Sequence, residues 1–217
     1  MNTILRNPDE IYKKSFAIIE EAFRDLSDSI DVKEIKKRAA HATADIEYGK
    51  GIILHPDAVS MGVNAIRNGN LIFTDVRMVK AGIRDTAEKR FGCKIKCYLY
   101  DRDVAETAKK ERVTKSIIAI RKASKILNGA VVAVGNAPTA LFELCRLIEE
   151  EDIKPALVVG IPVGFVGAAE SKEELMKSGI PYISNKGNRG GSSTAAAIVN
   201  GLVYLATLPT SKNNGSV

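Results

Sequence analysis

The spacing of hydrophobic residues changes along the chain. It is helical throughout the N-terminal part, and it alternates between strand-like and helical spacing in the rest. In three N-terminal segments, apolar side chains recur every three or four residues, which predicts amphipathic helices at residues 8–23, 31–44 and 55–70. Pro8, followed by two acidic residues, suits the start of a helix, and Asp31 is a favourable N-cap residue. The chain is therefore expected to begin with a group of helices.

After residue 70, short apolar runs alternate with segments of helical period. The runs predict strands at 71–75, 93–100, 130–136, 156–164 and 181–184. The segments between and after them predict helices at 76–91, 103–127, 138–150, 171–178 and 192–205. Strands that alternate with helices of this length form a mostly parallel sheet covered on both faces. The expected fold is therefore α/β: three layers, α/β/α, with about five strands, preceded by the N-terminal helices.

Length and composition are consistent with one compact unit. The chain has 217 residues, so we expect a single domain over residues 1–210 and a frayed tail at 211–217. A hydrophobic fraction of 45% and a charged fraction of 27% are typical of soluble globular proteins. There is no apolar run of membrane-spanning length and no apolar signal core at the N-terminus, so a cytoplasmic location without a membrane partner is expected.

The distribution of charged and aromatic residues indicates which kinds of ligand the protein can bind. The net charge of +6 is spread over the predicted helices, aromatic residues make up only 6%, and tryptophan is absent, which argues against nucleic-acid binding. The excess of positive charge suits a polyanionic small ligand, or it simply belongs to a solvated surface.

Cys93, Cys97 and Cys145 fit neither a redox pair nor a zinc knuckle and are expected to be buried reduced thiols. The sequence has no HxH, HExxH or nucleotide-binding glycine motif, so neither a protein-bound metal nor a nucleotide cofactor is predicted.

Several loops that follow predicted strands carry polar or glycine-rich sequence. In a parallel sheet, ligands gather where the strands end. Asp75 and Arg77 follow the first strand, and Gly135 precedes a helix opened by a proline. After the glycine-rich stretch at 160–167, Ser171 is predicted to cap a helix together with Glu174 in a capping box.

The last loop combines a cation, glycines and a hydroxyl group. It presents Arg189, Gly190, Gly191 and Ser192 at the mouth of the final predicted helix. Backbone N–H groups at a helix start bind carboxylates, and glycine lets a ligand approach closely. Anion binding and plain helix capping are both open for this loop.

His41 is one of only two histidines in the chain. On the helix predicted at 31–44 it lies three residues after Arg38, beside the apolar stripe that contains Ile35 and Ala39. A side chain at that margin can reach a cleft, and an imidazole suits proton transfer near neutral pH. On the residues alone a structural role is the more frequent one, because no Ser-His-Asp or Cys-His series accompanies it. The second histidine, His55, precedes a proline and marks the entry to a helix.

Six segments, spread over nearly the whole chain, are similar to one known family. They are PDEIYKKSFAII, RAAHATAD, GNLIFTDVRMVKAGI, VGNAPTALFEL, VVGIPVGFVGAAESKEEL and RGGSSTAAAIVNGL. On these segments the chain resembles the precorrin-8X methylmutases of cobalamin biosynthesis, a family that includes the cobalt-precorrin-8 methylmutases.

The resemblance implies an isomerase that moves a methyl group between adjacent carbons of a contracted tetrapyrrole, giving hydrogenobyrinate or cobyrinate. It implies no added cofactor, since any cobalt belongs to the substrate. The family's histidine falls on His41, as general acid, and its substrate-binding serine and arginine fall on Ser15 and Arg38. Where the family typically has Thr-Arg-Ser, this chain has Thr114, Lys115 and Ser116, so the charge is kept but the bidentate fork is lost.

The resemblance also implies a homodimer with sites near the subunit interface and allows direct hand-over of the product to the next pathway enzyme. Because the start of a helix attracts anions, we assign the residues from Arg189 through Ser192 as the binding site for the peripheral carboxylates of the substrate. The lysine- and isoleucine-rich composition favours the cobalt-containing substrate. Two other readings remain: a non-catalytic carrier that binds the same corrinoid, and an unrelated nucleotide- or phosphate-binding α/β protein.

Overall fold

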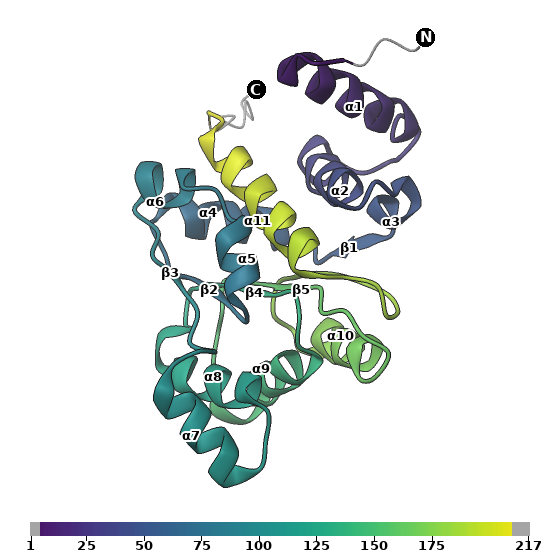
Figure 1. Ribbon diagram of the computed structural model, residues 1–217. Helices are drawn as coiled ribbons and strands as arrows, with labels where there is room; N and C mark the ends of the chain where they lie inside the picture. The colour runs from purple at the N-terminus through teal and green to yellow at the C-terminus, as the bar shows by residue number, and fades with distance from the viewer. Residues whose placement is uncertain (1–4, 210–217) are drawn as a thin grey trace, which may run out of the picture.

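The computed structural model describes residues 5–209 and is built around one six-stranded sheet (Figure 1). The strand order is β1-β6-β5-β4-β2-β3, with every neighbouring pair parallel except β1 and β6. The strands are β1 Ile52–Leu54, β2 Ile72–Thr74, β3 Ile95–Lys96, β4 Val131–Val134, β5 Leu157–Gly160 and β6 Tyr182–Asn185. The predicted mostly parallel α/β sheet is confirmed, with six strands instead of about five.

Helices cover both faces of the sheet and extend beyond one of them (Figure 1). One face carries α4 Ala58–Arg67, α5 Arg77–Gly82, α6 Thr86–Phe91 and α11 Ser192–Thr207. The other carries α7 Arg102–Glu111, α8 Lys115–Ala123 with the 3-10 turn Ser124–Ile126, α9 Pro138–Glu151 and α10 Ala168–Lys177. The N-terminal helices α1 Pro8–Ala22, α2 Ile30–Thr43 and α3 Ile46–Lys50 stack outside α11.

Two apolar cores follow from the alternation of side chains along the central strands. In β4, Val131 and Ala133 face the core shared with α4 and α11, whereas Val132 and Val134 face the core shared with α8 and α9. All four residues are fully buried, as expected for a parallel strand between two layers of helices.

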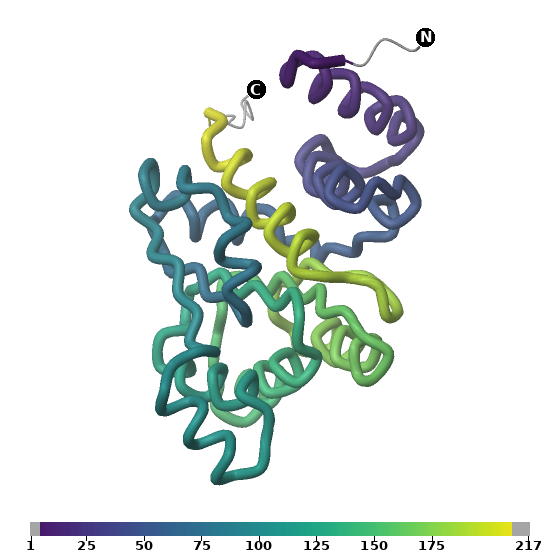
Figure 2. The backbone as a smooth tube through the Cα atoms, viewed as in Figure 1, coloured from purple at the N-terminus to yellow at the C-terminus, as the bar shows by residue number. Residues whose placement is uncertain are grey.

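The helix α2 runs antiparallel to α11, as the backbone tube in Figure 2 shows. Gly201 of α11 makes this approach possible, because a Cβ there would lie 2.9 Å from Ile35 Cδ1 and 3.3 Å from Arg38 Cγ of α2. Residues near the C-terminus of α2 consequently lie beside the N-terminal half of α11, near the edge where the parallel strands end.

Three predicted elements differ in their bounds. The helix predicted at 76–91 is broken between α5 and α6, where Ile83 adopts an extended conformation and buries its side chain. The helix predicted at 103–127 is broken at Arg112, which is left-handed with a φ of 58°, and α8 restarts after Thr114. Only Ile95–Lys96 of the strand predicted at 93–100 pairs in the sheet, and β1 was not predicted.

The predicted capping box is wrong. The helix α10 begins at Ala168, earlier than the predicted start, and its N-cap is Gly167, whose φ of 78° is left-handed. Ser171 therefore lies inside the helix, fully buried, and its hydroxyl donates to the carbonyl of Ala168 at 3.1 Å. A left-handed glycine next to Phe142 fixes the start of this helix instead of a side-chain cap.

The three cysteines are free, and Cys93 and Cys145 are buried, whereas Cys97 is half-buried. The tail predicted to fray, 211–217, lies outside the described residues. Over residues 5–209, no helix has both the length and the apolar character that crossing a membrane requires.

Candidate active site

His41 lies on the last turn of α2, on the face turned toward α1 and α11. Ile35 and Ala39 of α2 are fully buried and His41 is exposed, so the histidine lies at the margin of the apolar stripe as predicted. Its ring centroid is 5.0 Å from that of Phe16 and 6.0 Å from that of Tyr12, both in α1. The imidazole is therefore held by aromatic rings with one side open.

Arg38 lies beside His41. The guanidinium of Arg38 lies between two rings, 5.2 Å from the centroid of Phe16 and 4.8 Å from that of Tyr204, and its Nε donates to Glu34 Oε1 at 2.7 Å. Ser15 is half-buried and directly precedes Phe16 on α1, but it is not among the residues that line the cavity beside His41. The structure thus brings Arg38 and His41 together and leaves Ser15 next to this pair on α1. The cavity there is small, about 110 Å³, and is lined by Tyr12, Phe16, Arg38, His41, Ala42, Arg84, Ala197 and Asn200.

Arg189 joins the loop before α11 to the end of the helix that carries His41. Its guanidinium pairs with Asp45, and it stacks 4.7 Å from the centroid of the Tyr48 ring. Asp45 caps α3 by accepting the Tyr48 N–H at 2.8 Å. That N–H, and then Arg189, hold the pKa of Asp45 below its ordinary value. Asp45 follows His41 by four residues, so the two regions are mechanically connected.

The loop between β6 and α11 is also bonded to the loop after β5. The N–H of Gly191 donates to the Ile161 carbonyl at 2.9 Å, and the N–H of Gly164 donates to the Asn188 carbonyl at 3.1 Å. A Cβ on Gly190 would lie 2.6 Å from the Pro162 carbonyl oxygen, so only glycine fits between the loops. Ser192 is buried, and no side chain caps the N-terminus of α11 in the described residues.

Thr114, Lys115 and Ser116 lie at the start of α8. The Thr114 hydroxyl accepts the Ile117 N–H at 3.4 Å and lies 3.0 Å from the hydroxyl of Thr139 on α9. Lys115 is exposed on the first residue of the helix, and Ser116 is half-buried. The start of α9 continues this group toward the loop after β5, because Pro138 lies 3.9 Å from the Cβ position of Gly164.

The carboxylate of Asp75 holds the loop between β4 and α9 by hydrogen bonds to its backbone. Its carboxylate accepts the N–H groups of Gly135, Asn136 and Ala137 at 3.0, 2.8 and 3.0 Å. Burial raises the pKa of the carboxyl, and these three backbone bonds oppose the effect. Arg77, the other polar residue predicted at this strand end, points instead at the Tyr100 ring, with its guanidinium 4.4 Å from the centroid.

Lys172 supports the Arg189 loop and was not identified from the sequence. It is fully buried on α10, and its ammonium donates to the carbonyls of Gly187 at 2.8 Å and Arg189 at 2.5 Å. A signal was present, because Ala168, Ser171, Lys172 and Leu175 form the buried face of the helix at its three- and four-residue spacing. A lysine in such a stripe indicates an internal hydrogen-bonding role.

The buried Lys172 predicts an alkaline stability effect. Burial lowers its pKa from the ordinary 10.5 to about 8, so between these values the folded chain binds fewer protons than the unfolded chain and stability rises with pH. Relative to Lys172→Met, the wild type is expected to gain up to about 3 kcal/mol of unfolding free energy across this window. Urea unfolding at pH 7.5, 9 and about 10.5 measures the difference; a constant difference would contradict the prediction.

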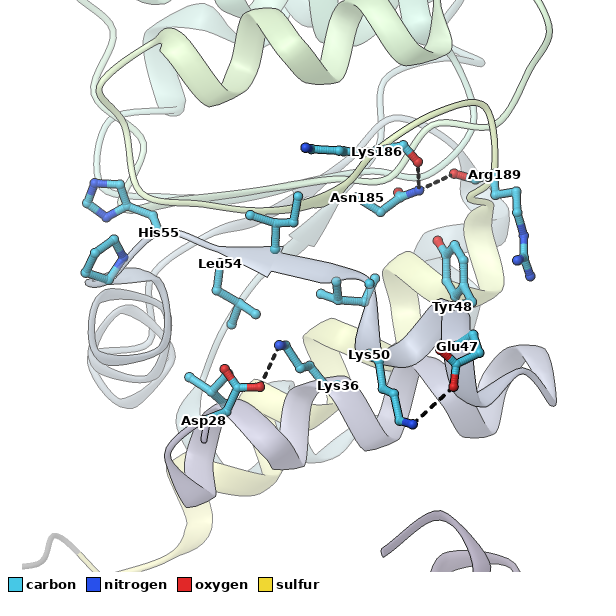
Figure 3. A pocket seen from close by; sticks show the side chains of 15 residues that line it. Asp28, Lys36, Glu47, Tyr48, Lys50, Leu54, His55, Asn185, Lys186 and Arg189 are labelled. Atoms are coloured by element: carbon cyan, nitrogen blue, oxygen red, sulfur yellow. Dashed lines mark hydrogen bonds and ion pairs between the residues drawn. The ribbon is translucent and has the colours of Figure 1, made fainter. Parts of the chain in front are cut away.

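A larger cavity, about 760 Å³, lies against the face of α2 opposite His41, and Figure 3 shows its lining residues. Val32 and Lys36 of α2 line it, and at 100° per residue Val32 points away from His41. In Figure 3 the ammonium of Lys36 pairs with Asp28 at 2.6 Å. The edge strand β1 crosses this cavity, and His55, Asn185, Lys186 and Arg189 complete its rim.

The cleft that His41 was expected to reach is therefore only a small cavity in a single copy of the chain. The cavity at His41 is small, and the residues Phe165 and Val166 of the loop after β5 are 95% and 87% exposed. Within residues 5–209, no cluster of three or more His, Cys, Asp or Glu side chains has an arrangement that could hold a metal ion.

Comparison with known proteins places this arrangement in a family. A model of the precorrin-8X methylmutase family matches residues 10–205. The chain belongs to the precorrin-8X methylmutase family. It is accordingly an isomerase of cobalamin biosynthesis that transfers a methyl group within one molecule, and the resemblance noted in the sequence is confirmed.

Relatives and solved structures agree with this placement. The chain is 45% identical to the cobalt-precorrin-8 methylmutase of Priestia megaterium, covering 92% of this chain and 88% of the relative. It is 43% identical to that of Methanocaldococcus jannaschii, over 87% of each. The crystal structure of the precorrin-8X methylmutase from Thermus thermophilus superimposes with a TM-score of 0.84 at 34% identity, covering 91% of this chain and 96% of that one. The methylmutase fold thus extends over nearly the whole chain.

Proposed function

We propose that this methylmutase acts on cobalt-precorrin-8, giving cobyrinate, with His41 as the general acid. The observation that carries the proposal is the grouping of His41 and Arg38 beside the rings of Tyr12 and Phe16, with His41 exposed. His41 would protonate the macrocycle, the methyl group would move with its bonding electrons to the adjacent carbon, and the proton would be returned. The atoms of substrate and product are the same, so the mass does not change.

The choice of the cobalt-containing substrate rests on the named relatives and on composition. Relatives at 45%, 43% and 42% identity are called cobalt-precorrin-8 methylmutases, as are three at 34% to 36%, whereas those at 38% and 39% are called precorrin-8X methylmutases. The cobalt would belong to the substrate. Residues of the chain would then bind, orient and protonate the ring.

The peripheral carboxylates of the tetrapyrrole are assigned to the strand-end loops. Arg189, Gly190, Gly191 and Ser192 offer a guanidinium and the uncapped start of α11, a helix of 16 residues. Thr114, Lys115 and Ser116 offer an ammonium and hydroxyls at the start of α8. The two groups would bind different arms of the macrocycle, while Ser15 and Arg38 contact the arm nearest His41.

A second copy of the chain would supply the missing wall of the site. The face around His41 is open, and Tyr12, Tyr204 and Met78 on α1, α11 and α5 are exposed large apolar residues. We therefore propose a homodimer that encloses the substrate beside His41. Sedimentation equilibrium should give twice the chain mass of 23.4 kDa, and a monomer at micromolar concentration would contradict this part of the proposal.

The function is tested by incubating the purified chain with cobalt-loaded and with metal-free precorrin-8. We expect the visible spectrum of the cobalt-loaded substrate to change while its mass, measured by mass spectrometry, stays the same. Faster conversion of the metal-free compound would reverse the substrate assignment. A spectral shift with one-to-one stoichiometry and no turnover would favour the corrinoid carrier.

Lys115 predicts a specific gain of affinity. Lys115→Arg is expected to lower KM by roughly 3- to 10-fold with kcat unchanged, because a guanidinium can form two parallel hydrogen bonds with a carboxylate. Steady-state kinetics measure the change, with Lys110→Arg on the exposed face of α7 as the matched control. An unaltered KM in both Lys115→Arg and Lys115→Ala would remove Lys115 from the binding site.

A further inference from the structure

Lys172 is a buried cation whose side chain ends among backbone carbonyls. Its side chain crosses from α10 to the loop between β6 and α11, which lies directly over this helix in Figure 2. Burial is the only cause that shifts its pKa, and no carboxylate contributes. Its acceptors are the carbonyl oxygens of Gly187 and Arg189. Since burying an ammonium without an ion pair is unfavourable, a methionine or leucine at this position would pack at lower cost unless the hydrogen bonds were needed.

The two carbonyls that accept from Lys172 belong to the loop that carries Arg189, so these hydrogen bonds hold that loop. Gly187 has a left-handed φ of 75°, which helps turn its carbonyl inward toward α10. The Arg189 carbonyl accepts twice, from Lys172 Nζ at 2.5 Å and from Asn185 Nδ2 at 2.9 Å, the second of which is drawn in Figure 3. With its carbonyl held inward, Arg189 directs its side chain outward, where the guanidinium is 61% exposed and pairs with Asp45.

A continuous set of contacts therefore runs from α10 to the helix of His41. Lys172 holds the backbone of Arg189, and the guanidinium of Arg189 pairs with Asp45. Asp45 caps α3, and its N–H donates to the Ala40 carbonyl of α2 at 3.2 Å. The backbone position of Arg189 thus depends on a lysine that has no access to solvent.

We propose that Lys172 is a positioning residue that fixes Arg189 for a carboxylate of the substrate. The proposal rests on the role of Arg189 given under the proposed function, and it deepens that role. Lys172 does not contact the substrate and acts only through the backbone of the loop. It therefore affects substrate binding and leaves proton transfer by His41 unchanged.

A double-mutant cycle on KM and kcat tests the coupling. Arg189→Met is expected to raise KM about 10-fold with kcat within about twofold, because a charge-assisted hydrogen bond to substrate is lost. Lys172→Met is expected to raise KM about fivefold, also with kcat retained, because the loop is less well ordered. The double variant is expected to match Arg189→Met alone, since Lys172 acts through Arg189.

The outcomes separate the two proposals. If Arg189→Met leaves KM unchanged, the carboxylate role of Arg189 fails. If Arg189→Met raises KM but the two substitutions multiply, Lys172 acts independently of Arg189 and the positioning role is overturned. Leu175→Ala, on the same buried face of α10, is the control for lost packing and is expected to lower Tm without raising KM. Should Lys172→Met not fold, Lys172→Gln, whose uncharged amide ends one atom short of the lysine Nζ and so weakens both bonds, takes its place in the cycle.

Discussion

Replacing His41 by alanine is expected to lower kcat roughly 100- to 10,000-fold, the range by which a positioned general acid or base accelerates proton transfer. The ring is exposed, and its contacts are with Tyr12 and Phe16 at the surface of α1, so its loss leaves no buried cavity. Substrate binding should therefore persist, because Arg38 and the strand-end loops remain. Single-turnover absorbance measurements at saturating substrate separate this loss of rate from a loss of affinity.

The other histidine provides the matched control. His55 lies across α2 on the rim of the large cavity, and its Nδ1 accepts the Asp57 N–H at 3.2 Å. His55→Ala should retain the wild-type rate. Conversion by His41→Ala at the wild-type rate would show that another group supplies the proton, and an equal loss in both variants would point to a general structural effect.

Replacing Asp75 by alanine is expected to destabilise the fold by about 3 kcal/mol or more, because three backbone N–H groups, two of them in buried residues, lose the carboxylate that accepts from them. These N–H groups belong to Gly135, Asn136 and Ala137, which connect β4 to α9. Asp75→Asn should lose most of the same stability, because its amide NH2 cannot accept the bonds that Oδ2 accepts from Asn136 and Ala137. Urea unfolding followed by circular dichroism measures both.

Asp85 is a suitable control for the loss of a carboxylate. It is exposed and pairs with Lys89 one turn later at 2.6 Å, so Asp85→Asn should change the unfolding free energy by less than about 0.5 kcal/mol. A similar small change for Asp75→Ala would mean that water or a rearranged loop satisfies the three N–H groups, and that the loop does not depend on this carboxylate.

The general fold could be predicted because the central strands and helices have clear periods. The runs that contain β4 and β5 are apolar throughout, as strands buried on both faces must be, and the helices between them have buried stripes. The strand β1 could not be predicted, because its three residues Ile52–Leu54 form a strand only by pairing with β6, more than 120 residues later. Local sequence does not encode such a partner.

Candidate site residues could be proposed from the sequence where the chemistry lies in side chains, and not where it lies in the backbone. His41, Arg38 and Ser15 were named from the resemblance, and the packing of α1 on α2 brings Phe16, the neighbour of Ser15, against His41 and Arg38. The capping box at Ser171 was wrong because Gly167 starts the helix with a left-handed residue, and Lys172 was passed over because a lysine ordinarily indicates a solvated face. Which carbonyls turn inward is decided by tertiary structure.

The close antiparallel packing of α2 on α11 fixes the distance between His41 and the loop at the start of α11. Ala197, which lines the cavity at His41, and Ser192 at the start of α11 are five residues apart, about 8 Å at the helical rise of 1.5 Å per residue. Because Gly201 lets the two helices touch, neither end of this span can shift without the other. A tetrapyrrole whose acidic arm is too short or too long would have to give up either the arginine or the imidazole, so the helix pair would select substrates by length as well as by charge.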